Sequence, residues 1–161
     1  FKHASVLALP FADATFDVVM MQHVAMQIAE KAKLFGECAR VLKGDGVLAL
    51  HEIFAGEGGP PLYPLAWATD PAMSSLETLE ECTTRLAHLG LQPGPFVDRS
   101  AEGQQYHLTN IKTMQQALAR QEGWQGLSVE ATHVRLQTAT SMERNLREGR
   151  LKVGMVVYRK T

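Results

Sequence analysis

The sequence predicts an α/β fold, and three apolar runs support this prediction. FDVVMMQ at Phe16–Gln22 is short and rich in β-branched residues and Met, as is typical of a strand buried on both faces. VLALHEIF at 47–54 reads as a second buried strand, and LKVGMVVYR at 151–159 reads as the last strand. A helix between the first two runs makes a βαβ unit, so we expect these two strands to be parallel.

The helix between these strands shows a clear apolar face. Its apolar residues recur at spacings of three and four, which is the helical period: Ile28, Ala32, Phe35, Ala39 and Leu42. Gly44 and Gly46 then supply the expected end of the helix, because Gly accepts the left-handed geometry common at that point.

The segment 55–73 is expected to be an irregular lid. Its first part, 55–71, contains four Pro and three Gly, which disfavours regular structure. Its apolar side chains include Tyr63 and Trp67, which are costly to leave in water. The segment is therefore an ordered lid or a partner surface.

The remaining elements are expected to be mixed. Ser74 and Glu77 match a capping box at the start of a helix that Gly90 ends. Segment 91–98 carries two prolines and is expected to be an irregular or edge strand. Two more helices are expected near 110–121 and 135–148, and Gly149 should end the second.

Composition indicates one globular domain, 1–161, without a polymeric partner. Lys plus Arg is 16 and Asp plus Glu is 17, so the charge offers no field for nucleic acid or an anionic membrane. Cys38 and Cys82 fall on helical apolar stripes, which favours buried free thiols and a cytoplasmic location. No apolar run approaches the roughly 20 residues that span a bilayer. Because the chain opens at Phe1 without Met, we expect a partial sequence.

Two long motifs resemble class I S-adenosylmethionine (SAM) dependent methyltransferases. LPFADATFDVVMMQHVAMQIAE at 9–30 is similar to their segment from the adenine-contacting loop into the fourth strand. ECARVLKGDGVLALHEI at 37–53 resembles the following helix, turn and fifth strand. QHVAMQIAEK, PPLYPLAWATDP and NLREGRLKVGMVVYRK are similar to the sarcosine and dimethylglycine N-methyltransferase type.

The resemblance implies a partial Rossmann-like sheet. The family has seven strands in the order 3-2-1-4-5-7-6, with strand 7 antiparallel and helices on both faces. This chain would supply strands 4 to 7, with the first half missing. The family's glycine-rich loop and ribose-binding acid have no counterpart here, because Gly56, Gly58 and Gly59 run into prolines. An NAD-dependent oxidoreductase is disfavoured for the same reason.

The implied function is methyl transfer from SAM to a small-molecule acceptor, with an amine among the candidates. Transfer from a sulfonium depends mainly on proximity and alignment, so the chain needs no strong base and we assign no catalytic residue. The alternative is a non-catalytic fragment or oligomeric interaction module, since the chain alone would bind SAM weakly or not at all.

The resemblance assigns cofactor contacts to two places. The loop residues Ser5, Val6 and Leu7 align with the segment along the adenine, and Ser5 replaces the acid usual there. The alternative for Ser5 is a loop serine without a role in binding. Gln22 and His23 close the first strand, at the end where open α/β sheets bind ligands. The alternative for this pair is a polar cap satisfied locally.

Five residues are candidates for substrate binding. Met26 and His51 lie toward the same rim, and His51 is suited to orient an amine or accept its proton. Tyr63 and Trp67 would wall an acceptor pocket and stack on a cationic amine. Asn145 lies among arginines that would meet a carboxylate. The alternatives are core packing for Met26 and a core histidine with a satisfied ring for His51. For Tyr63 and Trp67 the alternative is packing of the lid onto the sheet, and for Asn145 it is a solvated charged helix face.

The sequence predicts no metal site but does predict a larger assembly. The six histidines are scattered and no CxxC pair or GxSxG turn occurs, so neither a metal site nor a serine nucleophile is predicted. The strand 16–22 would have an open apolar edge, which predicts a homodimer or larger assembly that covers it.

Overall fold

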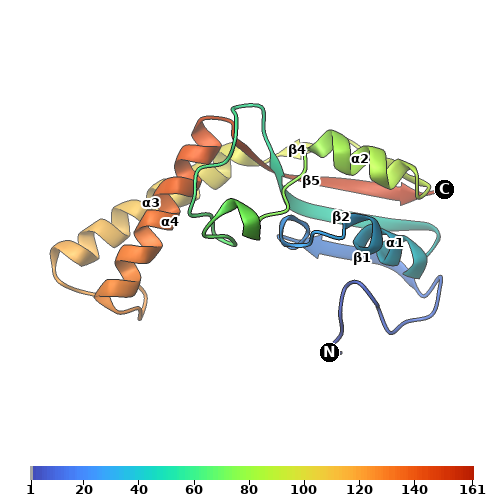
Figure 1. Cartoon of the computed structure of the whole chain (residues 1–161), viewed down its shortest axis with the longest axis horizontal. Coiled ribbons are helices and arrows are strands. Elements are labelled where there is room, and N and C mark those ends of the chain that lie inside the picture. Colours follow the sequence, from blue (N-terminus) through green and yellow to red (C-terminus); the bar gives the residue numbers. More distant parts are fainter. Residues whose placement is uncertain (1) are drawn as a thin grey trace. The chain divides into compact units, whose positions relative to one another are not determined.

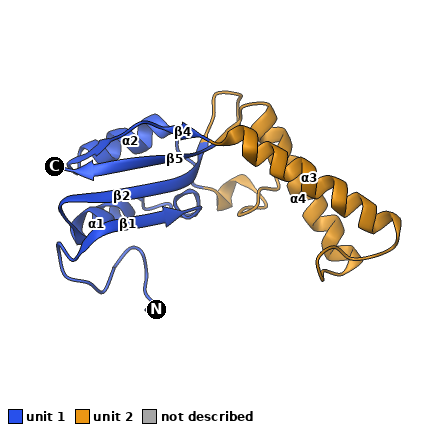
Figure 2. Ribbon diagram, turned by 180° about the vertical axis from the view of Figure 1, so that it is seen from behind, with its two compact units in different colours: residues 1–54, 75–98, 153–161 blue, residues 55–74, 99–152 orange. Residues whose placement is uncertain are grey.

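A computed structural model describes residues 2–161, which form two compact units (Figure 2). Unit 1 contains the chain up to Phe54 together with 75–98 and 153–161, and unit 2 contains 55–74 and 99–152.

Unit 1 is built on a five-stranded sheet (Figure 1). Its strands are β1 (Phe16–Gln22), β2 (Leu42–Ala55), β3 (Leu91–Pro93), β4 (Val97–Asp98) and β5 (Leu151–Lys160). The order is β1-β2-β5-β3, and β4 also pairs with β5. β1 and β2 are parallel, whereas β3 and β4 are antiparallel to β5. This matches the order 4-5-7-6 and the antiparallel seventh strand that the resemblance implied.

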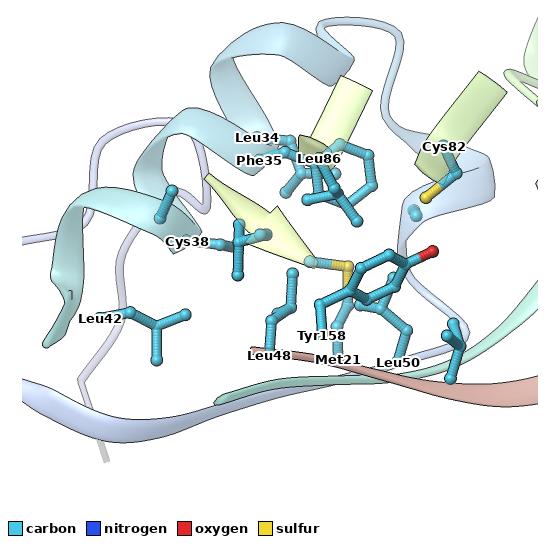
Figure 3. Packing of buried hydrophobic residues seen from close by; sticks show 14 of the residues in the cluster. Met21, Leu34, Phe35, Cys38, Leu42, Leu48, Leu50, Cys82, Leu86 and Tyr158 are labelled. Carbon is cyan, nitrogen blue, oxygen red and sulfur yellow. The ribbon is translucent and has the colours of Figure 1, made fainter. Parts of the chain in front are cut away.

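The core of unit 1 lies between this sheet and two helices, α1 (Lys31–Val41) and α2 (Leu79–Ala87) (Figure 3). Leu48 and Leu50 of β2 and Tyr158 of β5 meet Phe35 of α1 and Leu86 of α2 there. Cys38 and Cys82 are both buried in this core as free thiols, as their positions on apolar stripes predicted.

The opposite face of the sheet is open, and this corrects the expectation that 16–22 is buried on both faces. Val18 is 58% exposed and Met20 is 72% exposed, whereas Met21 is buried. Met155 and Val157 of β5 are likewise exposed. Alternate side chains of a strand point to opposite faces, and α1 and α2 both pack on the Met21 side. β1 is also an edge strand, so the expected open edge is confirmed.

The turn after α1 differs from the expected glycine stop. The helix ends at Val41 and β2 begins at Leu42, so Gly44 and Gly46 lie inside the strand. Gly46 is required for close approach, because a Cβ there would lie 2.9 Å from the Lys43 carbonyl oxygen and 3.2 Å from that of Asp17.

The capping box of α2 lies four residues later than expected. Thr78 Oγ1 accepts a hydrogen bond from the Glu81 backbone N–H at 3.1 Å, and Glu81 Oε2 accepts one from the Thr78 N–H at 2.8 Å. Ser74 and Glu77 precede the helix. Gly90 follows it with a φ of 76°, so the predicted glycine stop is confirmed.

Unit 2 combines the lid with two long helices. The lid contains one short 3-10 helix, η2 (Pro71–Met73), and a cis peptide between Tyr63 and Pro64. The helices are α3 (Ser100–Ala119) and α4 (Val129–Arg147). Both begin earlier than predicted, and Ser128 caps α4 by accepting from the Ala131 N–H at 3.1 Å. Gly149 follows α4 at a φ of 66°, as expected. Within 2–161, no helix combines the length and apolar character that crossing a bilayer requires.

Candidate functional site

The candidate site in unit 1 lies where β1 ends beside the parallel strand β2. Gln22 pairs in register with His51, which places both residues at the carboxyl rim of the sheet. His23 follows with a φ of 51°, and its backbone N–H donates to the His51 carbonyl at 2.9 Å. The 3-10 helix η1 (Ala25–Gln27) then leads away from the rim.

His23 and His51 form a ring pair at this rim. Their ring centroids are 4.7 Å apart and their planes are inclined by 52°. His23 Nδ1 is buried and has no hydrogen-bond partner among the described residues. Burial, and secondly the His51 ring, lower the pKa of His23. At neutral pH the rim therefore presents an uncharged imidazole whose buried Nδ1 has no hydrogen-bond partner among the described residues.

Two buried charged side chains hold the backbone that follows His23. Glu52 is fully buried, and its carboxylate oxygens accept from the Val24 N–H at 3.0 and 3.1 Å. Lys31 Nζ donates to the next carbonyl, that of Ala25. Burial raises the pKa of Glu52, and the Val24 hydrogen bond opposes this shift. Burial likewise lowers the pKa of Lys31. Glu52 and Lys31 therefore hold the backbone at Val24 and Ala25, directly after His23.

Further charges lie next to Lys31. Lys31 Nζ is 4.0 Å from Glu77 Oε1, and Arg85 Nη2 is 3.4 Å from Glu77 Oε2. Burial raises the pKa of Glu77, against the effect of these two cations. The sequence reasoning did not identify this group. One signal could have identified Lys31: it lies three residues before Leu34, which is the helical spacing of the buried face of α1.

The two motifs that carry the family resemblance are joined by hydrogen bonds. Glu37 Oε2 accepts from the Leu9 N–H at 2.6 Å. Arg40 donates to the Leu9 carbonyl at 3.0 Å and to the Phe11 carbonyl at 2.8 Å. Arg40 also pairs with Glu37, which lowers the pKa of the Glu37 carboxyl to about 2. Helix α1 therefore fixes the path of the loop that contains LPF.

The loop residues expected to contact the cofactor have local roles as well. Ser5 Oγ accepts from the Leu7 N–H at 3.2 Å, while Val6 and Leu7 pack against the core. Met26 is 4% exposed, and its carbonyl accepts from the Ser75 N–H at 2.8 Å. These contacts fit the packing alternative for Met26, and cofactor or substrate contact stays a prediction for all four residues.

In unit 2, the end of α4 anchors the lid. Asn145 is fully buried, and its amide both accepts from the Leu62 N–H and donates to the Leu62 carbonyl, each at 2.8 Å. Arg150 Nη1 donates to the Pro60 carbonyl at 2.6 Å. Arg144 and Arg147 pair with Glu148 and Glu143, so these arginines fit the alternative of a charged helix face.

The two lid aromatics are both half-buried. Trp67 Nε1 donates to Ser74 Oγ at 3.1 Å, and the Tyr63 carbonyl accepts from Ser141 Oγ at 3.5 Å.

The predicted site residues fall into two groups, one in each unit. Gln22, His23 and His51 come together at the rim of unit 1, whereas Tyr63, Trp67 and Asn145 lie in unit 2. Among residues 2–161, no three His, Cys, Asp or Glu side chains are grouped to hold a metal ion.

Comparison with known proteins agrees with this architecture. Residues 1–50 match the family model of the methyltransferase domain. No curated protein matches the sequence significantly. Among solved structures, a candidate sarcosine dimethylglycine methyltransferase from Galdieria sulphuraria has a TM-score of 0.80 and 20% identity, covering 99% of this chain and 58% of that one.

Two further structures show the same fold. Phosphoethanolamine N-methyltransferase 2 of Haemonchus contortus, bound to phosphomonomethylethanolamine and S-adenosylhomocysteine, has a TM-score of 0.78 and 14% identity over 97% of this chain and 36% of that one. The other structure is geranyl diphosphate C-methyltransferase of Streptomyces coelicolor, bound to Mg²⁺, geranyl diphosphate and S-adenosylhomocysteine. It has a TM-score of 0.74 and 14% identity, and the match covers 99% of this chain and 53% of that one. The chain thus has the SAM-dependent methyltransferase fold and spans 58% or less of these relatives' lengths.

Proposed function

We propose that this chain is part of a SAM-dependent methyltransferase that acts on a small-molecule acceptor, with amines as the first class to test. The match of residues 1–50 to the methyltransferase domain carries the proposal. That match contains β1 and most of β2, and Gln22 at the end of β1 pairs with His51 of β2.

The proposed cofactor contacts come from the loop Ser5–Leu7 and from the β1 rim. Bound SAM supplies an electrophilic methyl group on a cationic sulfonium. The backbone of Val6 and Leu7 would lie along the adenine, in a loop whose continuation Arg40 and Glu37 hold in place. Gln22 and His23 would line the methionine end, where an uncharged imidazole avoids repelling the sulfonium.

The acceptor contacts are proposed for each unit separately. His51 at the rim would orient an amine or accept its proton, and Met26 would supply apolar contact. Tyr63 and Trp67 would form aromatic walls for a cationic amine. Asn145 would act by fixing the lid at Leu62, since its own amide is buried there.

Calorimetry with SAM and with S-adenosylhomocysteine tests the proposal. We expect the product of the parent reading frame to bind both in the micromolar range, whereas the 161-residue chain alone binds at millimolar affinity or more weakly. Absence of binding by the reading-frame product would refute the proposal. A micromolar dissociation constant for the 161-residue chain would refute the expectation that this chain alone binds SAM weakly.

A second candidate is an oligomeric interaction module with the same fold. The observation that favours it is the edge strand β1, where Val18 and Met20 are more than half exposed. We expect a homodimer or larger assembly that covers Phe16–Gln22, and a monomer in light scattering would count against it. The buried free thiols Cys38 and Cys82 support a cytoplasmic location for either function.

A further inference from the structure

Unit 2 contains an apolar groove that includes Trp67 and otherwise consists of residues to which the proposed methyl transfer gives no role. The groove has a volume of about 590 Å³, which lies within the usual range for small-molecule sites. One wall is the lid, including Leu65, Trp67 and Met73. The other wall is one face of α4, where Ala131 and Val134 recur at helical spacing.

The walls of the groove are held in place by contacts of the lid. Trp67 Nε1 donates to Ser74 Oγ, and the Leu65 N–H donates to the Ala68 carbonyl at 2.7 Å. Leu65 is 3% exposed, so it is a buried part of the lining. Val134 is 63% exposed and Met73 is 54% exposed. A groove with fixed walls and uncovered apolar side chains is suited to an apolar ligand.

One cationic side chain borders this apolar surface. Arg135 is the single charged residue that lines the groove, and it forms no hydrogen bond or ion pair with another residue of 2–161. Its neighbour His107 is half-buried, and burial, with the Arg135 charge as the second cause, lowers the pKa of that imidazole. The guanidinium therefore has all its donors free for an anionic group.

From these observations we infer that the groove binds a small amphipathic anion, with an apolar chain along the lid and α4 and a carboxylate or phosphate against Arg135. This site needs no SAM and does not depend on the proposed methyl transfer. Charge decides the ligand class, because a cationic amphiphile would meet Arg135 with no nearby lining carboxylate to offset the repulsion.

Calorimetry at pH 8 with dodecanoate below its micelle concentration tests the inference, with dodecanol and dodecyltrimethylammonium as the neutral and cationic probes. We expect dodecanoate to bind most tightly and to shift the indole N–H resonance of Trp67 in NMR spectra. Equal or tighter binding of the cation, or no binding of dodecanoate, would overturn the inference.

Matched variants separate the two parts of the site. Arg135→Gln should weaken dodecanoate binding about tenfold or more, because a charge-assisted hydrogen bond is lost. Arg120→Gln, which alters an arginine outside the groove, should change it less than about twofold. Val134→Gln should weaken binding of dodecanoate and dodecanol alike, whereas Val129→Gln on the same helix should not.

A second copy of the chain is the competing occupant of the groove. If Val134→Gln converts a dimer into a monomer in light scattering while no probe binds, the groove is an interface and the inference is wrong. Binding of dodecanoate that Arg135→Gln leaves unchanged would also contradict it.

Discussion

The side-chain amide of Asn145 binds both backbone groups of Leu62, accepting from its N–H and donating to its carbonyl at 2.8 Å each. The two residues lie 83 positions apart in the chain. This pairing makes Asn145 a lid anchor, and the expected contact of its side chain with substrate stays a prediction.

Replacing Asn145 should loosen the lid. Asn145→Ala leaves two partly buried backbone groups of Leu62 without these partners, which should lower the free energy of unfolding by about 1–3 kcal/mol. Urea denaturation measures this loss, and faster hydrogen exchange of the Leu62 amide locates it. Thr140→Ala, an exposed change on the same helix, is the control and should have little effect. Unchanged exchange at Leu62 would show that the pairing does not hold the lid.

Replacing Glu52 should destabilise the backbone directly after His23. Glu52→Ala removes the acceptor of the partly buried Val24 N–H, and we expect a loss of about 2 kcal/mol in the free energy of unfolding. Glu52→Gln keeps one acceptor oxygen, so its loss should be smaller. Glu57→Ala, at an exposed glutamate, should be near neutral. If Glu52→Ala is as stable as Glu57→Ala, the hydrogen bonds from the Val24 N–H to Glu52 do not contribute to the stability of the fold.

Acid should weaken the attachment of the LPF loop to α1. The folded-state pKa of Glu37 is about 2, held down first by the Arg40 hydrogen bond, and lies below its ordinary value of 4.5. Its stabilising contribution is therefore present above pH 4.5 and is lost as pH falls toward 2. Urea denaturation of wild type and Glu37→Gln between pH 7 and pH 2 should show a stability difference that shrinks over this window. A difference that is independent of pH would contradict the assignment.

Protonation of His23 should discriminate between SAM and S-adenosylhomocysteine. The pKa of His23 lies below its ordinary value of 6.5, so the ring is neutral at pH 7.5 and takes up a proton as the pH is lowered. A proton there would repel the sulfonium of SAM but not the neutral thioether of S-adenosylhomocysteine. Calorimetry with the reading-frame product should show the SAM to S-adenosylhomocysteine affinity ratio falling as pH is lowered from 7.5 to 5. In His23→Asn the ratio should depend less on pH, and an equal dependence would exclude His23 as the cause.

Both cysteines should resist thiol reagents in the folded protein. Burial raises the pKa of the Cys38 thiol to about 11 and that of Cys82 to about 12, which removes the reactive thiolate at neutral pH. We expect negligible labelling by a disulfide reagent at pH 7.5 and labelling of both thiols in urea. Rapid labelling without urea would show that the core opens locally.

The sequence by itself determined the features that depend on local pattern. Phe16–Gln22 and the strand from Leu151 were predicted at or near their observed bounds, because short apolar runs are local signals. The motifs at 9–30 and 37–53 indicated the sheet order and the rim pair His23 and His51, since parallel strands end at one edge.

Tertiary structure decided the features that depend on distant partners. Val18 and Met20 look like core residues in the sequence, yet they are exposed because α1 and α2 pack on the other face. Lys31 and Glu52 read as ordinary charged positions until the fold buries them at the backbone after His23. Asn145 resembled a solvated site until the lid returned to it. Hydrogen bonds between segments far apart in the chain leave no periodic pattern in the sequence, so these roles appear only in the folded chain.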